Sequence, residues 1–235
     1  MQSNNWITLI ITFSLTLIWL RLNDYFAHRG WISGHLSRKI IHIGTGPIFV
    51  LCWVLFNESP TSRYLAALVP LAFTVQFFLI GIGIIKDPAS VQAMSRTGDR
   101  REILRGPLYY GIIFVLLTIV YWVDSPIGMV ALMLMCGGDG FADIFGRRFG
   151  SKKIPWNQGK SWAGSSAMFL GGLAFDVLIL IPFIQLDYFT GSLNAYLPKL
   201  ALIALLATIV ESLPFRDVDN ITITMTAVIA GELLF

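Results

Sequence analysis

Two aspartates near the end of a long apolar stretch are the first residues whose type and spacing suggest chemistry. Asp139 and Asp143 stand four residues apart. In a helix, that spacing places both carboxylates on one face, where they can hold a divalent cation between them. An ionised carboxylate in apolar surroundings costs free energy unless it is paired or coordinated. We therefore interpret Asp139 and Asp143 as metal ligands and catalytic residues, with Mg²⁺ as the expected ion.

Small residues recur at every fourth position through the same segment. Gly138, Ala142, Gly146 and Gly150 form a stripe without bulky side chains. A stripe of this kind usually marks close packing between two helices, and it equally lets the backbone of a ligand approach. The sequence leaves both interpretations open. The second makes Gly138, Gly146 and Gly150, with the neighbouring Arg147, candidate nucleotide contacts.

A basic segment follows the aspartates directly. Lys152, Lys153 and Lys160 supply mobile ammonium groups for phosphate oxygens, and Ser161 precedes the free N–H groups of the next expected helix. The alternative is a lysine-rich anchor at a membrane surface. Mg²⁺ is usually held by one or two carboxylates plus phosphates, so acids followed by lysines predict a Mg²⁺-bound nucleotide polyphosphate. Lys160 is counted among the catalytic residues.

Further polar clusters stand at the ends of other apolar runs. Arg38, Lys39 and Arg105 are candidate nucleotide contacts, with lipid headgroups as an equal alternative. His42 is a candidate substrate contact, although a lone histidine at a helix entrance is more often structural. Glu211 ends an apolar run and is a catalytic candidate, for the metal or for a substrate hydroxyl.

The short loop after Glu211 contains more acids. Asp217 and Asn220 are candidate substrate contacts there. The loop residues are equally compatible with turns and caps, in which case Asp219 or Asn220 caps the last helix.

Composition decides what kind of protein positions these residues. Hydrophobic residues make up 55% of the chain and charged residues 13%, which is roughly half the charged share of a soluble domain. A water-soluble globule is excluded on that basis, and a net charge of +3 gives no reason to expect nucleic acid as a partner. The periodicity predicts an all-α, polytopic transmembrane bundle of seven or eight helices, forming one domain over 1–235. The helices are expected near 5–20, 40–56, 64–85, 107–123, 127–146, 162–184, 197–213 and 220–235.

Lysine and arginine are distributed unevenly between the expected loops. With eight spans, only Arg63 and Lys199 fall on one side, while the others gather in 21–39, 86–105, 147–160 and at Arg216. The positive-inside rule places that second group, and with it the active face, in the cytoplasm. The oligomeric state is not indicated.

The joint pattern resembles the polyprenol kinase family of phytol, farnesol and dolichol kinases. Asp139, Ala142, Gly146 and Gly150 match the nucleotide signature of dolichol kinases. The closer likeness is to the phytol kinase branch of plants and cyanobacteria. Its blocks look like Arg38 to His42, Arg105 to Leu108, Gly138 to Asp143, Lys160 to Ser165, and Glu211 to Pro214.

The resemblance implies transfer of the γ-phosphate of CTP to the primary hydroxyl of phytol, a reaction that feeds tocopherol synthesis. It also implies a cyanobacterial-type or plastid membrane. Ala163 stands where dolichol kinases carry glutamate, which argues against dolichol as the substrate. The alternatives are a farnesol or geranylgeraniol kinase, a phosphatidate cytidylyltransferase-like enzyme, and a membrane transporter or scaffold. A transporter is expected to place its polar site near the midplane, whereas these polar blocks gather at one face.

Overall fold

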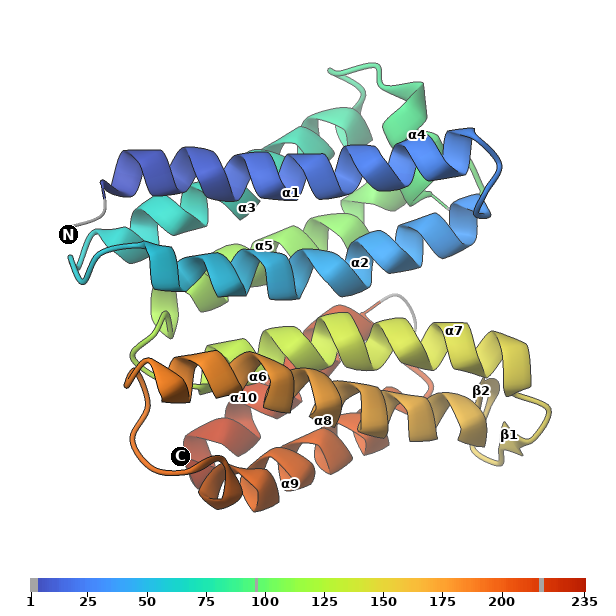
Figure 1. Ribbon diagram of the computed structural model, residues 1–235. Helices are drawn as coiled ribbons and strands as arrows, with labels where there is room; N and C mark the ends of the chain where they lie inside the picture. Colours follow the sequence, from blue (N-terminus) through green and yellow to red (C-terminus); the bar gives the residue numbers. More distant parts are fainter. Residues whose placement is uncertain (1–3, 96, 216–217) are drawn as a thin grey trace. The chain divides into compact units, whose positions relative to one another are not determined.

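Helices account for almost all of the computed structural model, which describes residues 4–95, 97–215 and 218–235 (Figure 1). The chain divides into two units at residues 119 and 120. The first unit contains α1 (Asn5–His28), α2 (Gly34–Leu51), η1 (Cys52–Leu55), α3 (Ser62–Ile82), α4 (Pro88–Met94), η2 (Arg100–Leu104) and α5 (Gly106–Val120, whose last residue opens the second unit). The second contains α6 (Ile127–Met133), η3 (Leu134–Gly138), α7 (Asp139–Phe149), β1 (Lys153–Ile154), β2 (Asn157–Ser161), α8 (Trp162–Gln185), α9 (Leu193–Glu211) and α10 (Asp219–Leu234).

Within the described residues, seven helical segments are long and apolar enough to cross a bilayer, which confirms the predicted polytopic all-α fold. They are α1, α2 with η1, α3, η2 with α5, α6 through α7, α8 and α9. Helix α10 has 16 residues, fewer than the roughly 20 that a spanning helix needs. It packs against α9 and α6 in the second unit.

The boundaries differ from expectation mainly near the start of the chain. Helix α1 continues to His28, and α2 begins at Gly34 because the Ser33 hydroxyl accepts a hydrogen bond from the Leu36 N–H at 3.2 Å. The expectation of a loop over 21–39 is therefore wrong for most of that range. The loop over 86–105 was also expected to be irregular, but it contains the short helices α4 and η2.

Helix α1 turns its polar side chains inward. Asn5, Thr8, Thr12 and Thr16 are buried on it, while large apolar residues such as Trp6 and Ile10 are exposed. The Thr8 hydroxyl donates to the carbonyl of Leu55, and the Asn5 amide donates to Ser62. Lipid is as apolar as leucine, so hydrogen bonds and close packing rather than the hydrophobic effect hold such helices together.

The second unit is built around the continuous helix formed by α6, η3 and α7. Every residue from Pro126 to Gly138 is buried, as expected for a helix surrounded by others. The π-helical turn η3 adds one residue just before Asp139, which rotates the following residues by about 100° relative to a regular helix. The unbroken run of buried residues ends at Asp139, so the first carboxylate of the helix lies where the helix begins to leave the core.

Asp176 lies within α8 and is completely buried, and neither carboxylate oxygen has a hydrogen-bond partner among the described residues. Burying an unpaired carboxylate is costly, whereas a neutral amide costs less. We therefore expect Asp176→Asn to leave the melting temperature in detergent unchanged or higher. Asp187→Asn, at an exposed position beyond the same helix, serves as control. A fall of more than about 4 °C for Asp176→Asn alone would reveal a stabilising partner of the carboxylate.

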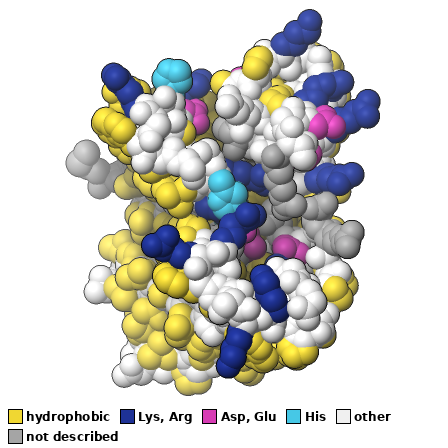
Figure 2. All heavy atoms as spheres, turned by 90° about the vertical axis from the view of Figure 1, so that its right-hand side faces the viewer, with side chains coloured by type: hydrophobic (Ala, Val, Ile, Leu, Met, Phe, Trp, Pro, Cys, Tyr) yellow, Lys and Arg dark blue, Asp and Glu magenta, His cyan; other side chains and the backbone are white. Residues whose placement is uncertain are grey.

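Basic side chains of the second unit gather at the end that carries the β-hairpin, which faces the viewer in Figure 2. Ser151 is exposed at this end of α8, and Thr190 is exposed in the loop beyond the other end. The positive-inside rule predicts that Ser151 faces the cytoplasm.

Single-cysteine labelling tests this topology, because both native cysteines are buried. We expect Thr190→Cys, but not Ser151→Cys, to react with an impermeant thiol reagent added outside intact cells. The reverse pattern would show that the assigned orientation is inverted.

Candidate active site

Helix α7 carries both predicted metal ligands. Because Asp139–Phe149 is regular α-helix, Asp139, Asp143 and Arg147 follow one another along a single face. The Asp143 carboxylate accepts a hydrogen bond from Arg147 Nε at 2.9 Å. Arg147, a predicted nucleotide contact, is thus an ion-pair partner of Asp143 in this structure.

The stripe of small residues on α7 faces the beginning of α8. A Cβ atom at Gly164 would lie 3.1 Å from the Ala142 carbonyl oxygen, and one at Gly146 would lie 3.4 Å from the Gly164 Cα. A Cβ at Gly138 would meet the Met168 sulfur at 2.7 Å. Of the two interpretations left open by the sequence, the structure displays helix packing. The small residues allow α7 and α8 to approach closely beside the aspartates.

The basic segment between these helices forms a β-hairpin. Strands β1 and β2 pair antiparallel, and the hairpin docks on the end of α9. The Asn157 amide donates to the carbonyls of Ser212 and Leu213, both at 3.1 Å, and Trp156 Nε1 donates to the Ser212 hydroxyl at 3.2 Å. No pattern in the sequence predicts this hairpin. Its docking brings Lys160 to the last residue of α9.

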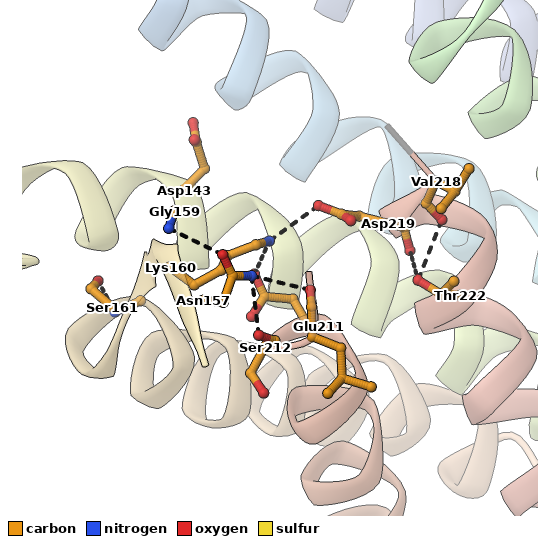
Figure 3. A network of polar contacts seen from close by, with 12 residues as sticks. Asp143, Asn157, Gly159, Lys160, Ser161, Glu211, Ser212, Val218, Asp219 and Thr222 are labelled. Atoms are coloured by element: carbon orange, nitrogen blue, oxygen red, sulfur yellow. Dashed lines mark hydrogen bonds and ion pairs between the residues drawn. The ribbon is translucent and has the colours of Figure 1, made fainter. Parts of the chain in front are cut away.

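Lys160 is the centre of a cluster of carboxylates (Figure 3). Its ammonium group forms ion pairs with Glu211 and, at 3.1 Å, with Asp219 at the start of α10. The Lys160 side chain is 24% exposed, whereas the Glu211 side chain is 3% exposed. Glu211 Oε2 is buried and has no hydrogen-bond partner among the described residues.

Electrostatics keeps Lys160 positively charged. Burial lowers the pKa of Lys160, but the negative charges of Glu211, Asp219 and Asp139 outweigh that effect and hold the pKa above its ordinary value. Lys160 is therefore an ammonium ion throughout the neutral range. Three carboxylates therefore act on this one ammonium group.

This donor set fits a divalent cation that arrives with phosphate. The described part of the chain contains no group of three acidic, histidine or cysteine side chains arranged to hold a metal ion. Mg²⁺ does not require such a cage, because one or two carboxylates and phosphate oxygens suffice. Asp139 and Asp143, one turn apart on a single face of α7, are the features of this site that favour a cation.

The remaining residues predicted in the second unit differ in accessibility. Lys152 and Lys153 are exposed on the hairpin, as phosphate contacts require. Ser161 is buried, and its hydroxyl accepts the Gly164 N–H at 3.1 Å as the N-cap of α8. Gly150 lies against Ser161.

Four predicted residues belong to the first unit. Arg38, Lys39 and His42 lie on α2, and Arg105 immediately precedes α5. The His42 ring packs against the Tyr110 ring in a tilted arrangement, with 4.6 Å between ring centroids and 40° between the ring planes, and the Tyr110 hydroxyl donates to the His42 carbonyl. His42 thus has a packing role between α2 and α5.

The loop between α9 and α10 is the segment for which the sequence was least informative. Asp217 and Arg216 lie outside the described residues, and Asn220 is half-buried in the first turn of α10. The interpretation of Asp219 or Asn220 as a helix cap is wrong, because Val218 occupies the N-cap position. Asp219 instead forms an ion pair with Lys160. The sequence feature that could have indicated a role for Asp219 in the site is its place in an acid-rich loop near Glu211.

Several curated plant proteins are similar to this chain over most of its length. A probable chloroplastic phytol kinase of Triticum aestivum is 45% identical over 92% of this chain and 73% of the relative. A phytol kinase of Arabidopsis thaliana is 41% identical over 88% and 69%, respectively. A farnesol kinase of the same species is 40% identical over 97% and 74%. No family model matches the chain, and no solved structure matches it.

The different surroundings of the two aspartates lead to a testable distinction. The negative charge of Asp139 helps to raise the pKa of Lys160, and the Asp143 carboxylate forms an ion pair with Arg147. We expect Asp139→Asn to lower phosphoryl-transfer turnover at saturating Mg²⁺ by about 100-fold or more, and Asp143→Asn to lower it less. Asp187→Asn is the control for loss of a carboxylate. Near-parental turnover of Asp139→Asn would contradict its assignment as a metal ligand.

Proposed function

This chain belongs to the phytol kinase family, a family of membrane prenyl alcohol kinases, and we propose that it transfers the γ-phosphate of CTP to phytol. The observation that carries the proposal is the 45% identity to a probable phytol kinase across nearly the whole chain. Kinase chemistry needs a nucleotide donor, and the cluster of carboxylates beside exposed lysines is suited to one. The product, phytyl phosphate, would feed tocopherol synthesis in a plastid or cyanobacterial-type membrane.

The proposed roles follow the geometry of the second unit. Asp139 and Asp143 hold Mg²⁺, and Lys152 and Lys153 contact the phosphates from the hairpin. Mg²⁺, when bound, supplies charge neutralisation and alignment of the phosphate oxygens. Glu211 positions the alcohol, whose isoprenoid tail lies among the helices.

Residues outside this centre have supporting roles in the proposal. Arg38, Lys39 and Arg105 contribute further positive charge toward nucleotide or lipid headgroups, and Gly138, Gly146 and Gly150 let α8 approach α7. Asn220 is proposed to border the alcohol, and a substrate contact by His42 stays a prediction from the sequence.

Farnesol is the second candidate substrate, because a farnesol kinase is 40% identical over 97% of this chain. An apolar groove discriminates weakly between tails, so related alcohols should compete. Release of CDP rather than pyrophosphate would separate the kinase from a cytidylyltransferase.

A panel of alcohols tests the proposal. We expect purified protein to phosphorylate phytol and geranylgeraniol faster than dolichol with CTP as donor, because Ala163 replaces the acid of the dolichol enzymes. Tails that differ by a methylene should differ by only ~1–3 kcal/mol in transition-state binding. Lys160→Ala should slow every alcohol alike, since Lys160 does not contact the tail. Faster turnover of dolichol than of phytol, or a reordering of the alcohols by Lys160→Ala, would contradict the assignment.

A further inference from the structure

Glu211 differs from the other carboxylates of the site in how its two oxygens are used. Oε1 is bound to the ammonium group of Lys160, while Oε2 is buried without a hydrogen-bond partner among the described residues. A buried polar atom left unsatisfied costs free energy, so its retention calls for an explanation. A hydroxyl group is the donor that would satisfy it without adding charge.

Lys160 forms ion pairs that its position in the sequence does not predict. The sequence predicts that this lysine contacts phosphate, and among the described residues it forms ion pairs with the carboxylates of Glu211 and Asp219. The Asn157 and Trp156 contacts fix the hairpin to the end of α9 and so hold Lys160 against Glu211. An ammonium group in this position favours the ionised form of the carboxylate and holds it in one orientation.

The location of Glu211 matches the place where an alcohol head would be. It is the last residue of α9, a helix with the length and hydropathy of a membrane span. The hydroxyl of a membrane-embedded prenyl alcohol lies at such a boundary, and the phosphate donor approaches from water. Glu211 is thus at the level where the two substrates meet.

We propose that Glu211 is the general base of the reaction and that Lys160 is its positioning residue rather than a phosphate ligand. This inference rests on the proposed kinase function. The alcohol O–H donates to Glu211 Oε2, and the alcohol oxygen forms a bond to the γ-phosphorus. The bond from that phosphorus to the β–γ bridging oxygen breaks, the hydroxyl proton passes to Oε2, and the nucleoside diphosphate leaves.

The test compares Glu211→Gln with Asp219→Asn, which removes the other carboxylate partner of Lys160. For each variant, kcat with phytol, the Kd of CTP and the half-saturating Mg²⁺ concentration are measured on the full chain in detergent. We expect Glu211→Gln to lower kcat by about 100-fold or more, because a positioned base typically contributes 10²–10⁴-fold. CTP affinity and Mg²⁺ dependence should stay close to the parent. Asp219→Asn should lower kcat by less than about tenfold.

Three results would overturn the inference. A parental kcat for Glu211→Gln would show that no base acts there. Recovery of kcat at high Mg²⁺ would make Glu211 a metal ligand, and a large loss of CTP affinity would make it part of the nucleotide site.

Two further comparisons complete the design. If Glu211→Gln does not fold, Glu211→Asp is used in its place. We expect Glu211→Asp to keep the parental affinity for CTP and to lower kcat by about tenfold or more. A parental kcat for this variant would overturn the proposal. A parent protein that binds CTP but phosphorylates no prenyl alcohol would instead reject the proposed function, and the inference with it.

Discussion

A bilayer offers no hydrogen-bond partners to peptide groups, and this constraint determines where the chain can place its chemistry. Within the apolar layer every backbone N–H and C=O must be satisfied by the chain itself, which leaves helices as the available structure. The seven candidate spans meet this hydrogen-bonding requirement. Contacts between helices are made at glycines, threonines and asparagines rather than by charged side chains. Irregular segments consequently lie between the helices, and charged side chains such as Asp176 of α8 are few within the described spans.

The site follows from that confinement. The edges of a two-stranded β-hairpin carry unpaired backbone N–H and C=O groups, so the hairpin belongs outside the apolar layer. It must still be held in one position if its lysine is to be placed accurately. Asn157 does so by donating to the carbonyls of Ser212 and Leu213, the two residues that directly follow α9. The contact that fixes the hairpin to the chain beyond α9 therefore also brings Lys160 to Glu211, the last residue of that helix.

The helical fold was predictable because apolar runs of sufficient length have few alternatives in a membrane. Asp139 and Asp143 were found for a similar reason, since charge within such a run stands out. Pairing between distant segments could not be predicted. Lys160 and Glu211 are 51 positions apart, and only the hairpin, which has no apolar periodicity, brings them together. The prediction that Lys160 contacts phosphate rests on its charge and on its place in the basic segment after the aspartates, and the sequence does not reveal the acids that surround it.

The arrangement of charge explains why acids and lysines occur side by side. A nucleotide polyphosphate is strongly negative, and the carboxylates of Glu211, Asp219 and Asp139 act on Lys160 in the same place. Bringing polyphosphate and carboxylates together in a partly buried place is unfavourable unless further positive charge intervenes. Lys152 and Lys153 are exposed and would supply part of it, and a divalent cation on Asp139 would supply the rest. An acidic centre bordered by exposed lysines therefore favours binding of a phosphate donor only when the metal ion binds with it. Nucleotide binding is expected to depend on the metal ion for this reason.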